Sequence, residues 1–491
     1  ITEGGSRAFM AAYNSWNGIP MSIHPCLEEI TRKQWGNNGI ICTDGGALKL
    51  LIEAHKSFPS FAEGAAAVVK ATTGQFLDAY VPYVKEALEK GLLTEVDIDK
   101  AIRGNIFVAL KLGLLDGDNS RNPYLSIGKN STETPPFMTA EARRLAREVT
   151  AKSVVLLKNK KLLPLDAGKL RKIAVIGPYS DKIVQDWYSG TPPYETTILS
   201  GIRNAVKEGT EIIHAEDNRM GQAEKAAAAA DVAIVCVGNH PYGTRADWKF
   251  SPVPSDGREA VDRKSLMLPD EDLVKLVLKA NPNTILVLVS SFPYTINWSQ
   301  EHVPAIVHIT HCSQEQGNGL ADVLFGKVNP AGRTVQTWVK DITDLPDIMD
   351  YDIRNGRTYM YHQGPVLYPF GYGLSYSDFT YEKIESFKQD KKNIRVTVSV
   401  KNTSGRDGEE VVQLYASYPE SKVERPSKQL RAFRRIPIKA GETRKVTLTV
   451  PKEELGYWNE GKQMFVVEPG TVKLLIGASS EDIRLEGKIR L

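Results

Sequence analysis

The pattern of apolar and polar positions divides the chain into three regions, and the first alternates short apolar runs with amphipathic helical patterns. Short apolar runs indicate strands, whereas apolar residues spaced three and four apart indicate helices. Such repetition of strand and helix is typical of a parallel sheet or a (β/α) barrel. A barrel has eight units and about three precede Leu115, so the barrel interpretation requires further sequence upstream. The predicted strands or strand ends are 8–13, 39–44 and 65–72, and the predicted helices are 27–36 and 81–93.

The second region contains strands that are apolar throughout, which indicates a sheet covered on both faces. Helices with one apolar face, predicted at 221–230 and 270–280, supply the covering layers. A stretch rich in Gly, Asn, Ser, Thr and Pro, from Asp116 to about Pro136, precedes this block and indicates a linker. The predicted strands are 153–159, 172–178, 231–239, 284–291 and 305–311.

The third region alternates apolar and polar positions between turn signals, the pattern of an antiparallel β-sandwich of fibronectin or immunoglobulin type. Its predicted strands are 394–403, 409–418, 444–451, 462–468 and 471–478. We therefore predict a multidomain α/β fold with three domains and one linker. These are the C-terminal part of a (β/α)8 barrel (1–120), the linker (121–140), an α/β sandwich (141–375) and a fibronectin type III-like β-sandwich (376–491).

Composition and charge exclude several classes of partner. The 491 residues carry 62 basic and 59 acidic side chains, so a net charge of +3 gives no reason to expect nucleic acid or an anionic membrane. No apolar run reaches the length that spans a bilayer. Four scattered cysteines, without CxxC or HExxH patterns, predict no metal site and no cofactor; Cys42 and Cys236 lie in apolar runs typical of buried free thiols.

The chain begins at Ile1 rather than at Met, and we interpret it as cut from something longer. No signal peptide precedes Ile1, so the sequence leaves a periplasmic, secreted or cytoplasmic location open. A homo-oligomer is compatible with this composition.

Asp44 is the first candidate for chemistry. It ends the apolar run GIICTD and is followed by Gly45 and Gly46. A carboxylate at the C-terminal end of a parallel strand points to the face where barrel enzymes place their chemistry, and two glycines let a substrate approach the backbone closely. In the alternative interpretation, which the bare pattern favours, Asp44 only caps the helix that follows.

Two stretches around Asp44, FMAAYNSWNGIPM (9–21) and WGNNGIICTDGGA (35–47), resemble the nucleophile segment of glycoside hydrolase family 3. The resemblance implies that Asp44 attacks the anomeric carbon to form a covalent glycosyl-enzyme, and that Tyr13 contacts the nucleophile or the sugar. Packing inside the barrel is the alternative for Tyr13. Many members carry Trp where Gly45 stands, and this departure is similar to the β-xylosidase branch, so glucose or xylose preference stays open. The residues in register with the family are Tyr13, Asn14, Asn17, Gly18, Pro20, Trp35, Gly36, Gly39, Thr43 and Asp44.

Hydrolysis with retention needs a second carboxyl group about 5–5.5 Å from the nucleophile, acting first as acid and then as base. The resemblance implies that this group lies just before the stretch 262–269, DRKSLMLP. Glu259 is the preferred candidate and Asp256 the rival. A solvated loop acid that pairs with a nearby arginine is the alternative for Glu259. Glu271 is a weaker candidate because it opens the following helix.

Aromatic residues surround the predicted acid. The loop 239–257 is long for a compact domain, which favours a functional loop. Tyr242 and Trp248 in this loop suit stacking on sugar faces. The stretch 186–194 stands where the family often has a Gly-Gly-Trp-Ser-like turn, and this resemblance implies that Trp187 is a platform for the leaving-group sugar. For each ring, plain packing is the alternative.

Further matches to the family extend over most of the chain, among them 156–165, 173–181, 314–338, 367–376 and 409–416. The resemblance implies a retaining exo-acting β-glucosidase or β-xylosidase that hydrolyses oligosaccharides or aryl and alkyl β-glycosides. Most residues that hold the sugar in this family come from earlier barrel strands, so a companion chain or an upstream segment is expected to complete the barrel. The main alternative is a non-catalytic carbohydrate-binding or scaffold fragment. A nucleotide-binding fold is disfavoured because no GxGxxG or P-loop follows the strand at 172–178.

Overall fold

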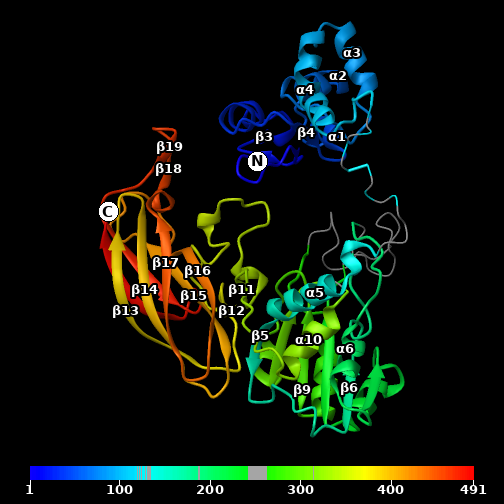
Figure 1. The fold of residues 1–491 in the computed structure, drawn as a ribbon, viewed down its shortest axis with the longest axis vertical. Helices are drawn as coiled ribbons and strands as arrows, with labels where there is room; N and C mark the ends of the chain where they lie inside the picture. The colour runs from blue at the N-terminus through cyan, green and yellow to red at the C-terminus, as the bar shows by residue number, and fades with distance from the viewer. Residues whose placement is uncertain are drawn as a thin grey trace. The chain divides into compact units, whose positions relative to one another are not determined.

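The computed structural model describes residues 1–118, 120, 122, 124, 125, 127, 129, 134–185, 188–240, 263–312 and 314–491. The described residues form two compact units, Ile1–Glu133 and Thr134–Leu491, each with hydrophobic clusters of its own (Figure 1). None of the described helices combines the length and the apolar character needed to cross a membrane.

The first unit is built on two parallel strands. β1 (Ala8–Ala11) pairs with β4 (Ile40–Thr43) so that Ala11 lies opposite Thr43, and Cys42 of β4 forms a parallel bridge with Gln75. These three segments lie side by side and run in one direction, as in part of a (β/α) barrel. The other elements are β2 (Ser15–Trp16), β3 (Ile19–Pro20), η1 (Met21–Ile23), the π-helix η2 (Leu27–Gln34), α1 (Ala47–Glu53), α2 (Phe61–Lys70), α3 (Val81–Glu89) and α4 (Glu95–Lys111).

The predicted strand at 65–72 is wrong, because most of these residues lie in α2. The Ser60 side chain accepts a hydrogen bond from the main-chain N–H of Glu63 and thereby caps the helix. Alanine, the strongest helix former, supplies much of the run. Six of the ten α2 residues are buried, so the helix has too little polar surface to display a helical period in the sequence.

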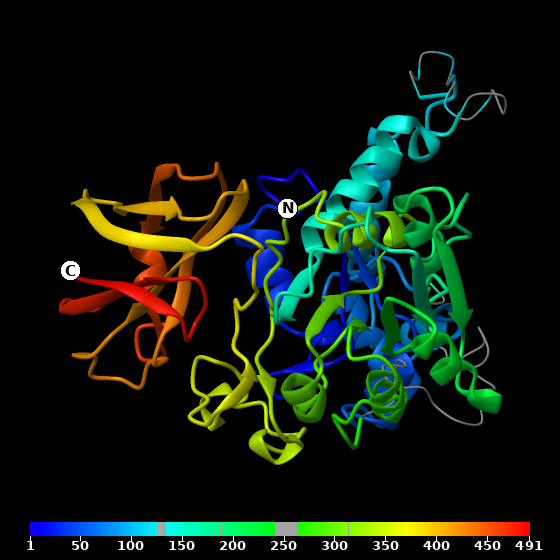
Figure 2. The same cartoon turned by 90° about the horizontal axis from the view of Figure 1, so that it is seen from below.

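The second unit begins with a six-stranded sheet in the order β5-β10-β9-β8-β6-β7, parallel except for β5. Five strands fall where the continuous apolar runs predicted them, and β7 at the edge was missed. Every residue of β8 and β9 is buried, because helices cover both faces of the sheet (Figures 1 and 2). The strands are β5 (Val155–Asn159), β6 (Lys172–Ile176), β7 (Glu211–Ala215), β8 (Val232–Gly238), β9 (Thr284–Val289) and β10 (Ala305–Ile309).

Helices α5, α6 and α10 pack with one hydrophobic cluster of this sheet, and α7, α8 and α9 with the other. The predicted helices 221–230 and 270–280 correspond to α7 and α8. Cys236, in the middle of β8, is a fully buried free thiol as predicted, whereas the free thiol of Cys42 is only partly buried. The helices and short elements are η3 (Pro136–Met138), α5 (Ala140–Ser153), α6 (Ile198–Ala205), η4 (Arg219–Gly221), α7 (Gln222–Ala228), α8 (Glu271–Ala280), α9 (Asn297–His302), α10 (Gln316–Leu324), β11 (Trp338–Val339), η5 (Ile342–Asp344), η6 (Ile353–Asn355) and β12 (Val366–Tyr368).

The last part of the chain folds as an antiparallel β-sandwich, shown in yellow to red in Figures 1 and 2. One sheet has the order β13-β14-β17 and the other β16-β15-β20-β21, and their inner faces share one hydrophobic cluster. The predicted multidomain α/β fold with a C-terminal β-sandwich is confirmed. The strands and short elements are β13 (Phe379–Gln389), β14 (Asn393–Asn402), β15 (Gly408–Ser417), β16 (Gln429–Ile438), β17 (Thr443–Pro451), η7 (Lys452–Leu455), β18 (Tyr457–Asn459), β19 (Met464–Val466), β20 (Thr471–Gly477) and β21 (Ile483–Arg490).

Candidate active site

Asp44 lies directly after the central strand of the first unit, where hydrogen bonds on both sides fix the backbone. Its main-chain N–H donates to the carbonyl of Ala11 at 3.2 Å, and the N–H of Thr43 donates to the carbonyl of Gln75 at 3.0 Å. The strand end that carries Asp44 is therefore held between its two parallel neighbours. The carboxyl ends of parallel barrel strands are the face on which such folds build active sites.

The carboxylate of Asp44 does not cap the following helix. Its Oδ1 accepts the N–H of the adjacent Gly45 at 2.7 Å. Helix α1 is instead capped by Asp78, whose Oδ1 accepts the N–H of Gly46 at 2.6 Å and whose Oδ2 accepts that of Leu48 at 3.3 Å. The capping interpretation of Asp44 is therefore wrong, and its partly buried carboxylate is left for another role.

The two glycines after Asp44 make different contributions. Gly46 has φ of +77°, a left-handed conformation that glycine adopts without strain. A Cβ placed on Gly45 would meet no described atom within 4 Å. Among the described residues, the position after Asp44 thus borders open space, which fits the predicted close approach of a ligand.

Tyr13 follows β1 at the same carboxyl edge, two residues beyond Ala11. Its carbonyl oxygen lies 2.7 Å from Nε2 of His55, and Nδ1 of His55 lies 3.3 Å from the hydroxyl of Ser15. His55 therefore ties the loop that carries Tyr13 to the end of α1. The phenol ring is 36% exposed, and its contact with a nucleophile or a sugar remains a prediction.

Burial and negative charge change the acidity of two neighbours of this strand edge. The pKa of the Cys42 thiol is raised by burial and by the adjacent Asp44. Burial, together with Asp78, raises the pKa of the Tyr80 phenol. Both side chains therefore stay protonated near neutral pH.

In the second unit, the parallel strands β6 and β8 end at one edge of the sheet. The chain runs from β6 to β7 on one side and then crosses back to β8, which pairs with β6 on its other side. Such a change of direction opens a crevice at the carboxyl ends of the strands, where α/β proteins bind ligands. In the sequence, Trp187 follows β6, and the predicted acid follows β8.

The end of β8 is firmly held against its neighbours. A Cβ on Gly238 would lie 1.8 Å from the carbonyl oxygen of Val289, so only glycine lets β8 pack this closely against β9. The side-chain Oδ1 of Asn239 accepts the main-chain N–H of Ser291 at 3.0 Å. The main-chain carbonyl oxygen of Asn239 lies 3.0 Å from Nε2 of His311. This network fixes the backbone at Gly238 and Asn239.

The predicted acid and the predicted aromatic platforms lie outside the described residues: Glu259, Asp256, Trp187, Tyr242 and Trp248. The chain is described again from Arg263, whose guanidinium stacks over the Phe292 ring at 3.7 Å and donates to the carbonyl of Pro293 at 3.1 Å. Arg263 is thus engaged with the segment after β9.

Glu271 opens α8 as predicted, and its carboxylate has a structural role. Its Oε1 accepts the hydroxyl of Ser299 at 2.8 Å and the main-chain N–H of the same residue at 3.2 Å. These bonds join α8 to α9. No group of three or more His, Cys, Asp or Glu side chains suited to a metal ion occurs in the described part of the chain.

Three family models match successive parts of the chain. The model described as the glycosyl hydrolase family 3 N terminal domain matches residues 1–104, and the one described as the C-terminal domain of that family matches residues 154–376. A fibronectin type III-like domain matches residues 410–480.

Individual relatives of the chain are named β-glucosidase or β-xylosidase. A periplasmic β-glucosidase of Salmonella typhimurium is 30% identical over 98% of this chain and 67% of its own length. A β-xylosidase of Formosa agariphila is 29% identical over 98% of this chain and 68% of its own length. The crystal structure of a β-glucosidase from Listeria innocua in complex with isofagomine is 26% identical, with a TM-score of 0.83 over 100% of this chain and 69% of that one. The chain thus spans about two thirds of the length of these relatives.

Proposed function

The chain belongs to glycosyl hydrolase family 3, a family of glycoside hydrolases, and on this basis we propose that it carries the nucleophile of a retaining, exo-acting β-glycosidase. The proposed substrates are β-glycosides with a terminal non-reducing glucosyl or xylosyl residue. Relatives named β-glucosidase and β-xylosidase match with nearly equal identity, so both sugars belong to the proposal.

In the proposed mechanism, the carboxylate of Asp44 attacks the anomeric carbon of the sugar. The bond between this carbon and the leaving oxygen breaks while a carbon–oxygen bond to Asp44 forms, and the second carboxylic acid donates its proton to the leaving oxygen. The same group then removes a proton from water, which attacks the anomeric carbon and releases Asp44. Glu259 is the proposed acid and base, with Asp256 as the alternative.

The observation that carries the proposal is the position of Asp44 together with its hydrogen bonding. It ends a parallel strand at the carboxyl edge, and the adjacent helix is capped by Asp78 instead. A nucleophile needs a carboxylate whose orientation is fixed but whose oxygen can reach the substrate. The Gly45 N–H on Oδ1 provides orientation without covering the carboxylate with a cation.

We also propose that further βα units complete the barrel around Asp44, from a companion chain or from another part of a longer polypeptide. In the first unit, the described strands that run parallel are β1 and β4, with Gln75 bridged beside them. A closed barrel of this class has eight strands. The sugar is expected to bind partly to residues from those additional units.

Covalent trapping tests the proposal directly. The complete protein would be incubated with 2-deoxy-2-fluoro-β-D-glucosyl fluoride and, separately, with the corresponding xylosyl fluoride, and then digested for mass spectrometry. We expect a single 2-fluoroglycosyl adduct on the peptide that contains Asp44. A label on another carboxylate would assign the nucleophile elsewhere.

Activity needs its own measurement, because trapping reports only the first step. Rates on a panel of 4-nitrophenyl α- and β-glycosides would identify the sugar, and NMR of the first-formed product would give its anomeric configuration. We expect hydrolysis of β-glucoside or β-xyloside with initial formation of the β-anomer. A complete protein that turns over no member of the panel would favour the non-catalytic alternative.

A further inference from the structure

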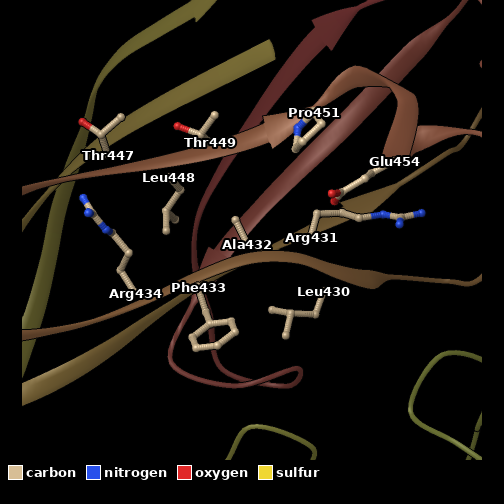
Figure 3. A pocket seen from close by; sticks show the side chains of 10 residues that line it. All are labelled: Leu430, Arg431, Ala432, Phe433, Arg434, Thr447, Leu448, Thr449, Pro451 and Glu454. Atoms are coloured by element: carbon tan, nitrogen blue, oxygen red, sulfur yellow. The ribbon is translucent and has the colours of Figure 1, made fainter. Parts of the chain in front are cut away.

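The β-sandwich has one edge at which its two sheets do not close. β16 is the last strand of one sheet and β17 the last strand of the other, and a cavity of about 580 Å³ lies between them. Figure 3 shows Arg434 rising from β16 toward Thr447 on β17, with Thr449 further along the same strand. Hydroxyl and guanidinium groups thus line this part of the opening.

The opening continues into a second cavity of about 630 Å³. Arg431 and Glu454 line both cavities, and Figure 3 shows Glu454 reaching toward the Arg431 side chain from the segment after β17. We call the two cavities together the sandwich groove. Each has the size of a site for a small ligand.

Aromatic rings line the second cavity of the groove. Tyr361, Tyr457 and Phe465 line the second cavity, and Phe465 is 67% exposed. The ring of Trp458 lies 5.4 Å from that of Phe465 at an angle of 72°, and is itself 48% exposed. Such exposure of large rings on a short hairpin is unfavourable in water, which indicates a surface suited to binding.

The polar lining carries both signs of charge. Glu424, Glu453 and Glu454 supply carboxylate acceptors at the exposed rim. The guanidinium of Arg425, with a side chain only 6% exposed, stacks 3.7 Å above the Tyr418 ring and donates to the carbonyl of Leu455 at 2.9 Å.

A second arginine, Arg431, lines both cavities and is also held in place. Nη2 of Arg431 donates to Oε1 of Gln429 at 2.5 Å. The bonds of Arg425 and Arg431 hold both guanidinium groups in place before any ligand binds. Side chains that are already ordered lose less conformational entropy when a ligand binds.

We propose that the sandwich groove binds a neutral oligosaccharide chain. Sugar rings offer an apolar face that stacks on aromatic side chains and hydroxyl groups that both donate and accept hydrogen bonds. Carboxylates at the rim would repel an anionic ligand, and the two arginines disfavour a cationic one. The proposal is independent of turnover at Asp44, because it concerns binding and not hydrolysis.

Addition of a peptide strand to β16 is the competing use of the groove. Natural edge strands avoid such pairing with charged side chains and proline. β16 carries Arg431, Arg434 and Arg435 and has Pro437 near its end, and β17 ends at Pro451. These features oppose the addition of a peptide strand to β16.

Calorimetric titration of the full chain with cellotetraose and xylotetraose tests the proposal, in an Asp44→Asn background so that the ligands stay intact. Phe465→Ala and the isosteric Glu454→Gln should each weaken binding to the groove by roughly tenfold. Phe387→Ala is the matched control, because Phe387 is 40% exposed on β13 and does not line the groove. Quenching of Trp458 fluorescence, absent in Trp458→Phe, would report the same event.

The inference is overturned when neither tetrasaccharide binds, or when both groove variants bind them as tightly as the parent does. It is also overturned when the groove variants change only the self-association of the chain, measured by light scattering, because the groove would then be a protein interface. Hydrolysis without groove binding would refute this inference alone. Groove binding without hydrolysis would instead leave it standing and refute the proposed activity.

Discussion

Oδ1 of Asp78 accepts the main-chain N–H of Gly46 at 2.6 Å, so the helix after Asp44 is capped from a neighbouring strand end rather than by Asp44. The carboxylates of Asp78 and Asp44 therefore have different structural roles at this edge. Asp78 satisfies the N–H groups that begin α1 and holds the turn, and Asp44 sits on that turn with one N–H on its Oδ1. A fixed turn is what a nucleophile requires, because small displacements of a reacting group slow catalysis strongly.

Replacing Asp78 by Ala is expected to destabilise the first unit by about 1–2 kcal/mol, the usual effect of removing a helix cap. Asp78→Asn should cost less, because an amide oxygen can still accept one N–H. Urea unfolding monitored by circular dichroism measures the difference, with Asp99→Ala on the exposed face of α4 as the control. Equal stability of Asp78→Ala and the parent protein would show that α1 does not depend on this cap.

The sequence located Asp44 but not Asp78, although both follow short apolar segments. Asp44 has a dense local motif around it, from Tyr13 to Gly46, whereas Asp78 acts on residues thirty-two positions upstream. The segment GQFLD, an apolar run that ends in an acid beside a parallel bridge at Gln75, carries the same signal as GIICTD in weaker form. Spatial pairing of the two segments, which one sequence does not reveal, is needed to recognise it.

Asp44→Ala is expected to abolish turnover, lowering kcat by at least about a thousandfold, because no other group can form the glycosyl-enzyme. Stability should change little, since the side chain accepts one local N–H and does not cap α1. Initial rates on a 4-nitrophenyl β-glycoside, combined with a thermal unfolding curve of the same preparation, separate the two effects. Turnover within tenfold of the parent would contradict the nucleophile assignment.

Glu259→Ala should slow substrates with poor leaving groups far more than activated ones, because an activated leaving group needs no protonation. Azide should partly restore the rate by attacking the glycosyl-enzyme without a general base. Comparing aryl glycosides of graded leaving-group pKa measures this dependence, with Asp256→Ala as the paired variant. Equal losses on all substrates for Glu259→Ala, with graded losses for Asp256→Ala, would move the acid role to Asp256.

Fold elements were predictable where burial produced an unmistakable pattern. Continuous apolar runs identified the central strands β8 and β9, because helices on both faces leave no polar side. The edge strand β7 was not predicted, because its five residues, EIIHA, mix apolar with polar side chains and are mostly not buried. The misassigned segment 65–72 shows the opposite failure, because a helix buried on several sides also produces a continuous apolar run.

A buried ion pair joins the α/β block to the β-sandwich. Nη2 of Arg333 lies 3.1 Å from Oε2 of Glu410, with side chains 10% and 3% exposed, and the hydroxyl of Tyr381 donates to Oε1 at 2.9 Å. Glu410→Ala should therefore destabilise the second unit by about 3–5 kcal/mol, because it leaves a buried guanidinium without its partner.

The neighbouring residue provides the control for this prediction. Glu409 pairs with Arg435, but the Glu409 side chain is 28% exposed and the Arg435 side chain 25%, so Glu409→Ala should cost only about 1 kcal/mol or less. Denaturant unfolding of the second unit, followed by tryptophan fluorescence, compares the two variants. Similar losses for both would mean that burial does not set the strength of the Arg333 pair.

His308 on β10 makes stability depend on pH in a defined window. Its Nε2 lies 3.1 Å from both the carbonyl and the hydroxyl oxygen of Ser290, and its ring centroid lies 5.2 Å from that of Trp338 at an angle of 81°. Burial lowers the pKa of His308 to about 4, and the nearby His311 adds to this effect. The folded protein therefore keeps the imidazole neutral where the unfolded chain protonates it.

Between pH about 6.5 and 4, the unfolded chain thus binds a proton that the folded chain does not. The free energy of unfolding should fall as the pH falls through this window, by at most about 1.4 kcal/mol per pH unit from this group. His308→Gln keeps a hydrogen-bonding side chain but removes the titration, so its unfolding free energy should fall less steeply than that of the parent. Urea unfolding at closely spaced pH values measures both slopes, and carboxylates common to the two proteins cancel in the difference. Parallel pH profiles would show that His308 titrates alike in the folded and unfolded chains.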